Sequence, residues 1–279
     1  MAYPVISAPY GLKPINLIGG QVFAGSTREY AIPYGYATDI FYGDIVGLSR
    51  GNVQRLSVST GTLGTVTGVF LGVSYTNPTT KQKQFAQNWV GGTVAGDAMA
   101  IVCDDPDTVF KAAVCSSGTT VASGSYAMVG QNYQMINTVG STATGNSSNA
   151  LLYSATLTTS TFPMRVVGVV PDTASSVSAT GSSSSTTITL TGSGLPSAIV
   201  AGTDVSYIAS NGQTVRTGSF VTTAASAGAT SVTINVATSS LGNTATAIPS
   251  GSTIVFTQIP EMLVKINFGN HEYYTATAV

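Results

Sequence analysis

Short runs rich in Val, Ile, Tyr and Thr, each ended by Gly, Pro, Asn or Asp, follow one another along the whole chain. Gly and Pro recur every few residues, which leaves little room for the uninterrupted periodicity of long helices. Short strand-forming runs separated by turn signals are typical of sandwiches and small barrels. The pattern therefore predicts an all-β protein. Residues 79–89 are one of the few stretches that could form a helical turn, and we interpret them as a surface loop.

Three apolar segments of the first half recur, in the same order, further along the chain. The best-matched pair is residues 71–73 (Leu-Gly-Val) and 167–169 (Val-Gly-Val). We interpret the recurrence as the duplication of one small β-barrel or sandwich unit, the first at residues 20–115 and the second at residues 116–172 plus 260–279. The three segments and their counterparts are residues 43–49, 68–75 and 96–102, and residues 124–129, 165–170 and 261–266.

Residues 173–259 interrupt the second unit and carry two charged side chains, Asp204 and Arg216. Their Ser-rich start suits a flexible linker, but the segment contains a repeat of its own. Each half begins with a run in which Thr and apolar residues alternate, followed by a turn with proline and a run that starts with Gly. The alternation allows one face of each strand to be buried. We predict an inserted, Ser/Thr-rich, sandwich-like β-domain with hinges at residues 171–172 and 259–260. The four runs are residues 186–191, 202–208, 230–236 and 251–256.

Residues 1–19 contain Pro4, Pro9 and Pro14, and proline favours extended backbone at its own position and at the residue before it. We therefore predict an extended N-terminal arm. Tyrosine, which is enriched in the cores of protein interfaces, is concentrated in this arm and just after it. Two interpretations stay open: aromatic packing at barrel edges, or an arm that lies on a neighbouring subunit. The candidate contact residues are Tyr3, Pro4, Tyr10, Leu12, Ile15, Tyr34 and Tyr36.

Charged residues make up 8% of the 279 positions, compared with roughly 25% in an ordinary soluble domain. Lys plus Arg number 10 and Asp plus Glu number 11, so the net charge of −1 creates no overall field that would attract nucleic acid or anionic lipid. A hydrophobic content of 43% is too high for a disordered chain. No apolar run approaches the about 18 to 20 residues of a membrane helix, and the N-terminal residues do not look like a signal peptide. We expect neither nucleic acid nor a membrane as a partner.

Side chains for acid and base catalysis are scarce, since the chain has one histidine, His271, and three glutamates. A single histidine cannot form an ordinary zinc site, and we expect His271 to be hydrogen-bonded in the last strand or at a contact. No Gly-x-Ser-x-Gly motif connects a strand to a helix. The sequence therefore predicts that the protein is not an enzyme and that it has no catalytic residues and no cofactor.

Asp104, Asp105 and Asp107 form the densest acidic spot of the chain. A Ca²⁺ site needs six or more oxygen ligands, and neither an acidic partner nor the spacing of an EF-hand lies nearby. We interpret these residues as a tight turn whose Asp side chains cap backbone amides. Whether they also bind a cation stays open.

The two cysteines, Cys103 and Cys115, are too few for a disulfide framework. If residues 104–107 form a turn, Cys103 lies near Thr108 and not near Cys115. We expect two free, unreactive thiols and assembly of the protein in a reducing compartment.

Five stretches of the chain resemble structural proteins from tailed bacteriophages of marine bacteria. They are residues 8–28 (APYGLKPINLIGGQVFAGSTR), 42–46 (YGDIV), 68–75 (GVFLGVSY), 104–107 (DDPD) and 263–267 (LVKIN). The resemblance covers roughly residues 1–172 and 260–272 and excludes the insertion.

This resemblance implies a capsid decoration (cement) protein, built of small β-barrels that lie on the outer shell, tie capsomers together and stabilise the head. The implied partner is the major capsid protein, and the implied location is the capsid exterior of a virion assembled in the host cytoplasm. On this basis we expect the arm before Gly20 and the loops of the first unit to contact the capsid, while the insertion projects outward. Closed cyclic symmetry at the three-fold lattice positions favours a homo-oligomer, with a trimer as the first expectation.

An alternative function is a tail-fibre component or surface adhesin that binds cell-surface polysaccharide, with which the Ser/Thr-rich insertion and the aromatic residues are compatible. Copy number separates the two, because a decoration protein occurs in far more copies per particle than a fibre. A polysaccharide-cleaving enzyme would need a pair of carboxylates across a groove, and the sequence does not place Glu261 or Asp172 opposite another acid.

Overall fold

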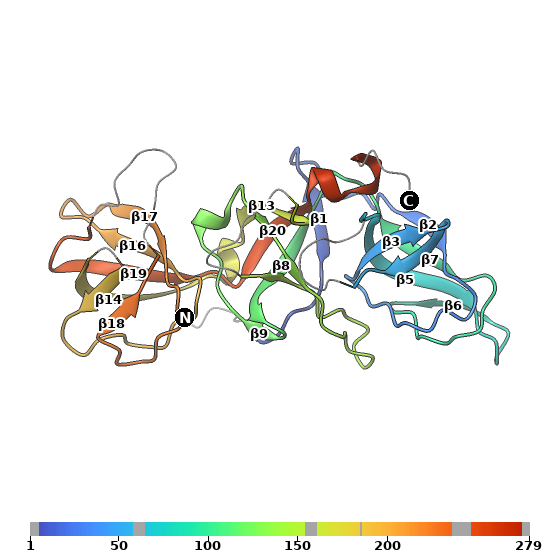
Figure 1. The fold of residues 1–279 in the computed structure, drawn as a ribbon, viewed down its shortest axis with the longest axis horizontal. Coiled ribbons are helices and arrows are strands. Elements are labelled where there is room, and N and C mark those ends of the chain that lie inside the picture. The colour runs from blue at the N-terminus through green and yellow to red at the C-terminus, as the bar shows by residue number, and fades with distance from the viewer. Residues whose placement is uncertain (1–5, 58–64, 154–160, 185, 236–246, 275–279) are drawn as a thin grey trace.

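The computed structural model describes residues 6–57, 65–153, 161–184, 186–235 and 247–274, and strands make up 47% of it. The predicted all-β fold is confirmed, and the strands form three lobes arranged in a row (Figure 1). Within these described ranges, no helix is both long and apolar enough to cross a membrane. The helical segments are short 3-10 turns: η1 (Tyr126–Met128), η2 (Pro171–Thr173), η3 (Phe268–Asn270) and η4 (Glu272–Tyr274).

The first barrel is the right-hand lobe of Figure 1, a closed ring of five strands in the order β3-β4-β2-β7-β5, in which β5 also pairs with β3. A sixth strand, β6, pairs with β5 outside the ring. Val46, Phe70, Val102 and Trp89 fill the core of this barrel. The strands are β2 (Arg28–Ala31), β3 (Ile45–Ser49), β4 (Asn52–Arg55), β5 (Gly68–Thr76), β6 (Lys83–Ala86) and β7 (Met99–Cys103).

The central sheet forms the middle lobe and follows the path β10-β13-β20-β8-β12-β11. Since Gln134 alone separates β10 from β11, this path starts and ends on one continuous stretch of chain. Strands β1 and β9 also pair with β8. The strands are β1 (Lys13–Leu17), β8 (Thr108–Ser117), β9 (Thr120–Val121), β10 (Asn132–Tyr133), β11 (Met135–Ile136), β12 (Ala150–Leu152), β13 (Met164–Val169) and β20 (Glu261–Ile266).

The first barrel and the central sheet share one topology, as expected for a duplicated unit. Each contains a single parallel pair of ring strands, β2 with β4 in the barrel and β8 with β12 in the sheet. The antiparallel pair β5 and β7 corresponds to β13 and β20. In both pairs the register shifts by one residue at the same point, at Leu71 in β5 and at Val167 in β13, directly before the glycine of each matched motif.

The proposed match between residues 43–49 and residues 124–129 is wrong. In the first barrel, the N–H of Gly43 donates to Phe70 O, and the N–H of Phe70 donates to Asp44 O. The same two bonds in the central sheet join Gly130 and Gln131 to Val166, so Gly130 is the counterpart of Gly43. Both glycines have positive φ, 89° and 84°, and the duplication preserved this turn while the residues after it changed.

Two boundaries also differ from the prediction. Strand β8 belongs to the central sheet, although the first unit was expected to extend to residue 115. Strand β1 pairs with β8 of the same chain, so the expected arm is a strand of the central sheet over Lys13–Leu17. Proline fits here because Pro14 lies beside a bulge in a strand at the side of the sheet.

The inserted domain is the left-hand lobe, a six-stranded sheet in the order β17-β16-β19-β14-β15-β18. A bridge between Val221 and Ile234 joins the two ends of this order. The predicted internal repeat is visible in the pairing, because equivalent strands pair with each other, β15 with β18 and β16 with β19. The domain therefore has a pseudo-two-fold axis. The strands are β14 (Ser175–Ser183), β15 (Thr187–Leu190), β16 (Asp204–Ile208), β17 (Thr214–Phe220), β18 (Ser231–Thr233) and β19 (Ser252–Gln258).

The junction between the inserted domain and the central sheet does not have the expected hinge at residues 259–260. Ile259 is buried in the central core, its N–H donates to Ser123 Oγ over 2.7 Å, and its carbonyl accepts the N–H of Gly124. A hinge residue must change its backbone angles freely, and these bonds fix the backbone of Ile259 at this point.

Candidate contact surface

The predicted contact residues differ widely in exposure. Tyr34 and Ile15 have 72% and 43% of their surface exposed, so their side chains are available to a partner. Leu12 is fully buried in the core shared by the first barrel and the central sheet, and the prediction that it makes an external contact is wrong. Its N–H donates to Gly43 O, which places the chain between the two units. Tyr3 and Pro4 lie outside the described residues.

Tyr10 is half-buried and is held by its own chain. Its hydroxyl donates to the carboxylate of Glu261, which also forms an ion pair with Lys111 (3.3 Å). The ammonium group of Lys13 lies 4.4 Å from the centre of the Tyr10 ring, a cation–π contact. Burial and the neighbouring Glu261 raise the pKa of Tyr10. The Tyr10 hydroxyl is thus bound to the only carboxylate of β20.

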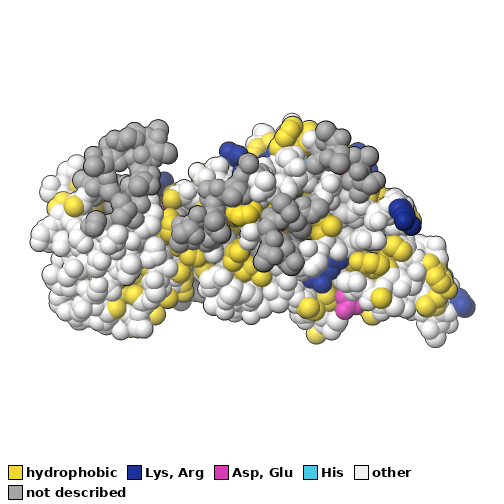
Figure 2. Space-filling model, in the orientation of Figure 1, with side chains coloured by type: hydrophobic (Ala, Val, Ile, Leu, Met, Phe, Trp, Pro, Cys, Tyr) yellow, Lys and Arg dark blue, Asp and Glu magenta, His cyan; other side chains and the backbone are white. Residues whose placement is uncertain are grey.

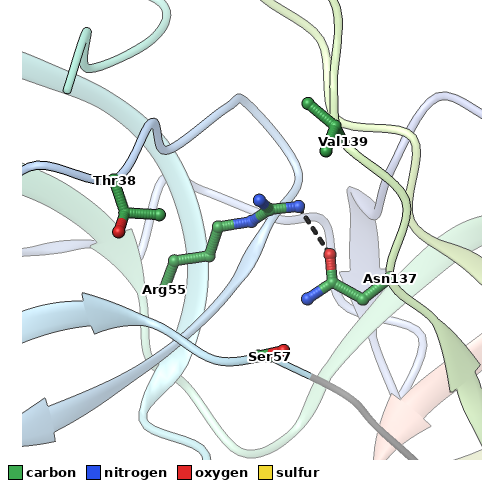
Figure 3. A pocket seen from close by; sticks show the side chains of 5 residues that line it. All are labelled: Thr38, Arg55, Ser57, Asn137 and Val139. Atoms are coloured by element: carbon green, nitrogen blue, oxygen red, sulfur yellow. Dashed lines mark hydrogen bonds between the residues drawn. The ribbon is translucent and has the colours of Figure 1, made fainter.

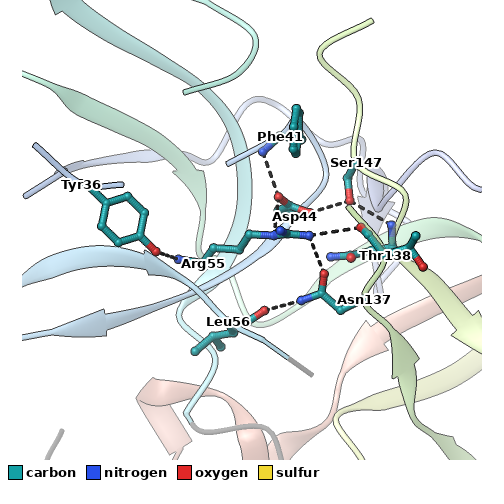
Figure 4. Close-up of polar contacts among 9 residues, drawn as sticks. Tyr36, Phe41, Asp44, Arg55, Leu56, Asn137, Thr138 and Ser147 are labelled. Atoms are coloured by element: carbon teal, nitrogen blue, oxygen red, sulfur yellow. Dashed lines mark hydrogen bonds and ion pairs between the residues drawn. The ribbon is translucent and has the colours of Figure 1, made fainter. Parts of the chain in front are cut away.

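Tyr36 is part of a polar network at the seam between the first barrel and the central sheet. Its hydroxyl accepts the backbone N–H of Arg55 over 3.0 Å. The Arg55 side chain then crosses the seam, where its guanidinium donates to Asn137 Oδ1 and to Thr138 O (Figure 4). Asn137 returns a bond to Leu56 O at 2.7 Å. The first barrel and the central sheet are therefore joined by reciprocal hydrogen bonds.

Asp44 is the buried centre of this network, with no exposed surface. Its carboxylate pairs with Arg55 Nε (3.0 Å) and accepts bonds from the Ser147 hydroxyl (2.6 Å) and from the N–H of Phe41 (2.9 Å). Burial raises the pKa of Asp44, and Arg55, Ser147 and the Phe41 amide act in the opposite direction. A buried carboxylate with this many donors is a satisfied structural ion pair.

A pocket of about 310 Å³ opens beside this network (Figure 3). Among the residues that line it, Arg55 and Asn137 point toward each other and are hydrogen-bonded. The Arg55 guanidinium already contacts Asp44, Asn137 and Thr138. The pocket therefore has few free hydrogen-bond donors for an anion. The remaining lining residues are Thr38, Ser57 and Val139.

The acidic residues at 104–107 form the predicted turn. Asp105 caps the N–H of Asp107 with its side chain, and Asp107 pairs with Lys265 (3.2 Å). Asp104 is buried and pairs with Arg28 (3.2 Å). Tyr30 and Tyr273 donate to the Asp104 carboxylate. Across the part of the chain that the structure describes, no three His, Cys, Asp or Glu side chains are grouped so that they could hold a metal ion.

His271 is buried and lies between η3 and η4, not in a strand. Its Nδ1 accepts the N–H of Tyr273 (3.2 Å), and its backbone forms a bridge with Val66 of the first barrel. Burial lowers the pKa of His271. Both cysteines are free and buried, and Cys103 Sγ lies 3.5 Å from Thr108 Oγ1, as the turn predicted.

Comparison with family models, with curated proteins and with solved structures finds no match for this chain. Exposed apolar side chains are the feature with the clearest distribution.

Large exposed hydrophobic residues gather outside the inserted domain. Among the described residues there are thirteen, and Ile208 alone belongs to that domain. On the face in Figure 2, the left-hand lobe is mostly white, while yellow and charged side chains lie mainly over the other two lobes. No sequence pattern marks Val22 and Phe85 as exposed, although 80% and 77% of their surfaces are, because an apolar residue in a turn or strand is usually buried. The other ten are Ile15, Ile18, Tyr34, Val90, Val94, Val129, Val139, Phe268, Tyr273 and Tyr274.

The base of the inserted domain is fixed to the central sheet by its two charged residues. Asp204 Oδ1 accepts the N–H of Tyr126 (3.2 Å), and the guanidinium of Arg216 lies 3.8 Å from the centre of the Tyr126 ring. Nearby, Tyr153 donates to Val221 O, and its ring meets that of Phe220 edge to face. The domain is therefore docked by specific contacts.

The docked domain is expected to be most stable in acid. Burial raises the pKa of Asp204 from 3.8 to about 6, against the opposing effects of the Tyr126 amide and Arg216. Because the folded state then binds more protons than the unfolded state between pH 4 and 6, stability falls by about 3 kcal/mol as pH rises through this window. Denaturant unfolding from pH 4 to 7 should show this slope, and Asp204→Asn should make it shallower. An unchanged slope in the variant would assign the effect to other groups.

Proposed function

We propose that this chain is a structural protein of a tailed-phage virion, a decoration protein that binds the major capsid protein on the capsid exterior and stabilises the head. The observation that carries the proposal is the distribution of large exposed apolar residues, since twelve of the thirteen found among the described residues lie outside the inserted domain. The first barrel and the central sheet then form the attachment surface. They are also the part of the chain that resembles phage structural proteins.

Rigidity supports the same role. A cement protein must hold a fixed shape against a lattice, and here the core of the central sheet includes residues of the first barrel, and hydrogen bonds join the two units at their seam. The inserted domain, which has one large exposed hydrophobic residue among those described, projects away from the capsid in this proposal. Assembly as a trimer at three-fold positions and a non-enzymatic role remain part of the proposal.

Single charged substitutions test the attachment surface. Removing residues 1–19 would also remove β1 from the central sheet, so point variants are the cleaner choice. Val22→Asp, Tyr34→Asp and Phe85→Asp each place a charge on an exposed apolar position, and at least one is expected to weaken binding to undecorated particles about tenfold or more. Co-sedimentation measures the binding, and particle density maps then show the occupancy of each variant.

Ile208→Asp in the inserted domain is the matched control and should bind as the unmodified chain does. Normal binding by all three attachment variants would contradict the proposal. Copy number separates the fibre alternative, because a decoration protein should occur in hundreds of copies per particle and a fibre in tens.

A further inference from the structure

The pseudo-two-fold axis of the inserted domain gives it two equivalent turns, one at each end. Residues 200–203 precede β16, and residues 249–252 lead into the antiparallel β19, which begins at Ser252. Each turn is closed by a bond between its first carbonyl and its fourth N–H, 3.4 Å in the first turn and 3.3 Å in the second. Each has a glycine with positive φ at its third position, Gly202 (85°) and Gly251 (78°).

The two turns differ in what they meet. At the base, Ala201 O accepts the N–H of Ser123 (2.9 Å), and Gly202 packs so closely on Ser123 that no side chain would fit. At the tip, a side chain on Gly251 would meet nothing within 4 Å. A hollow of about 540 Å³ lies there instead. The end of the domain that corresponds to its docked base is thus open.

The tip differs from the base in its side chains, because hydroxyl groups occupy positions that are charged or apolar at the base. The position of Asp204 is occupied by Thr253 at the tip, and Ala201 is replaced by Ser250. The two charged residues of the domain, Asp204 and Arg216, both act at the base. The hollow is lined by hydroxyls together with an aromatic and an aliphatic side chain, among them Tyr207, Ile208, Ser210, Ser250, Ser252 and Thr253.

We propose that this hollow is a binding site for a neutral saccharide. Its volume lies within the range of about 300–1,000 Å³ that is usual for ligand sites. A sugar offers hydroxyls that can exchange hydrogen bonds with the serine and threonine side chains, and a C–H face that can pack on the ring of Tyr207. An anionic or cationic ligand would lose hydration without meeting an opposite charge. This activity is separate from capsid attachment and uses the opposite end of the molecule.

The test uses the full chain and a panel of neutral sugars (glucose, galactose, mannose, N-acetylglucosamine and their disaccharides), with sialic acid and galacturonic acid as charged probes. Saturation-transfer NMR and titration should find at least one neutral sugar that binds with a Kd of about 1 mM. Ser250→Arg, which fills the hollow from an exposed turn, should abolish this binding. Tyr207→Leu keeps apolar volume in the partly buried position and should weaken binding about tenfold.

Ser226→Arg, at an exposed serine in another turn of the same domain, is the matched control and should bind normally. Circular dichroism of each variant confirms that the domain is folded. Failure of every neutral sugar to bind overturns the proposal. So does unchanged binding by Ser250→Arg, and so does equal binding of the charged and the neutral sugars. None of these results bears on capsid attachment, which is measured on particles.

Discussion

Replacement of Asp44 by alanine is expected to lower the free energy of unfolding by about 3–5 kcal/mol, because it leaves the buried guanidinium of Arg55 without its counter-ion. The side chain of Arg55 is 11% exposed, so water can replace the carboxylate only in part. The Phe41 amide and the Ser147 hydroxyl lose an acceptor at the same time. Urea unfolding at pH 7 measures the change.

Asp172→Ala is the matched control, since Asp172 is an exposed aspartate in η2 and its loss should change stability by less than about 0.5 kcal/mol. The double variant Asp44→Asn with Arg55→Met removes both charges and should recover part of the loss. If Asp44→Ala unfolds at the same urea concentration as the unmodified chain, the network does not hold the seam.

Local patterns were sufficient to predict the fold class and the best-matched strands of the two related units. Alternating Thr and apolar residues at 186–191 and 230–236 predict strands with one buried face, and the structure pairs these two strands with each other. The Leu-Gly-Val and Val-Gly-Val motifs mark the same bulge in both units. Such features depend on neighbouring residues, so a single sequence displays them.

Long-range pairings could not be predicted in the same way. Arg55 meets Asn137 across 82 positions, and Asp44 meets Ser147 across 103, with no motif that connects them. The burial of Leu12 could not be predicted for the same reason, since an apolar residue between prolines suits an exposed arm as well as a buried strand. Only the pairing of β1 with β8 decides between them.

The low charge of the chain has a structural explanation in the inserted domain. Both of its charged residues are used to dock its base, and serine and threonine hydroxyls cover much of the rest. Hydroxyls keep a strand face polar without the long-range repulsion or attraction of charges. In the proposed decoration role, a domain of this kind would project from the particle without disturbing the electrostatics of the attachment surface.

Gly202→Ala is expected to separate the inserted domain from the central sheet. A Cβ at this position would lie 1.8 Å from Ser123 O, a backbone atom that can give way only if the two units move apart. The left-handed backbone alone costs roughly 1–2 kcal/mol, and the lost junction contacts of Asp204 and Tyr153 add to this. Calorimetry should show the inserted domain unfolding in a separate transition at lower temperature, and small-angle scattering should show a broader range of molecular lengths.

Gly251→Ala provides an internal control that the pseudo-symmetry of the domain makes possible. The two glycines have nearly the same φ and occupy equivalent turns, but a Cβ at Gly251 meets nothing within 4 Å. This variant should therefore show the cost of the backbone conformation alone, about 1–2 kcal/mol, with scattering unchanged. The difference between the two variants measures the docking of the inserted domain directly. Equal effects would mean that the junction contributes nothing, and the domain would then be free to move relative to the first barrel and the central sheet.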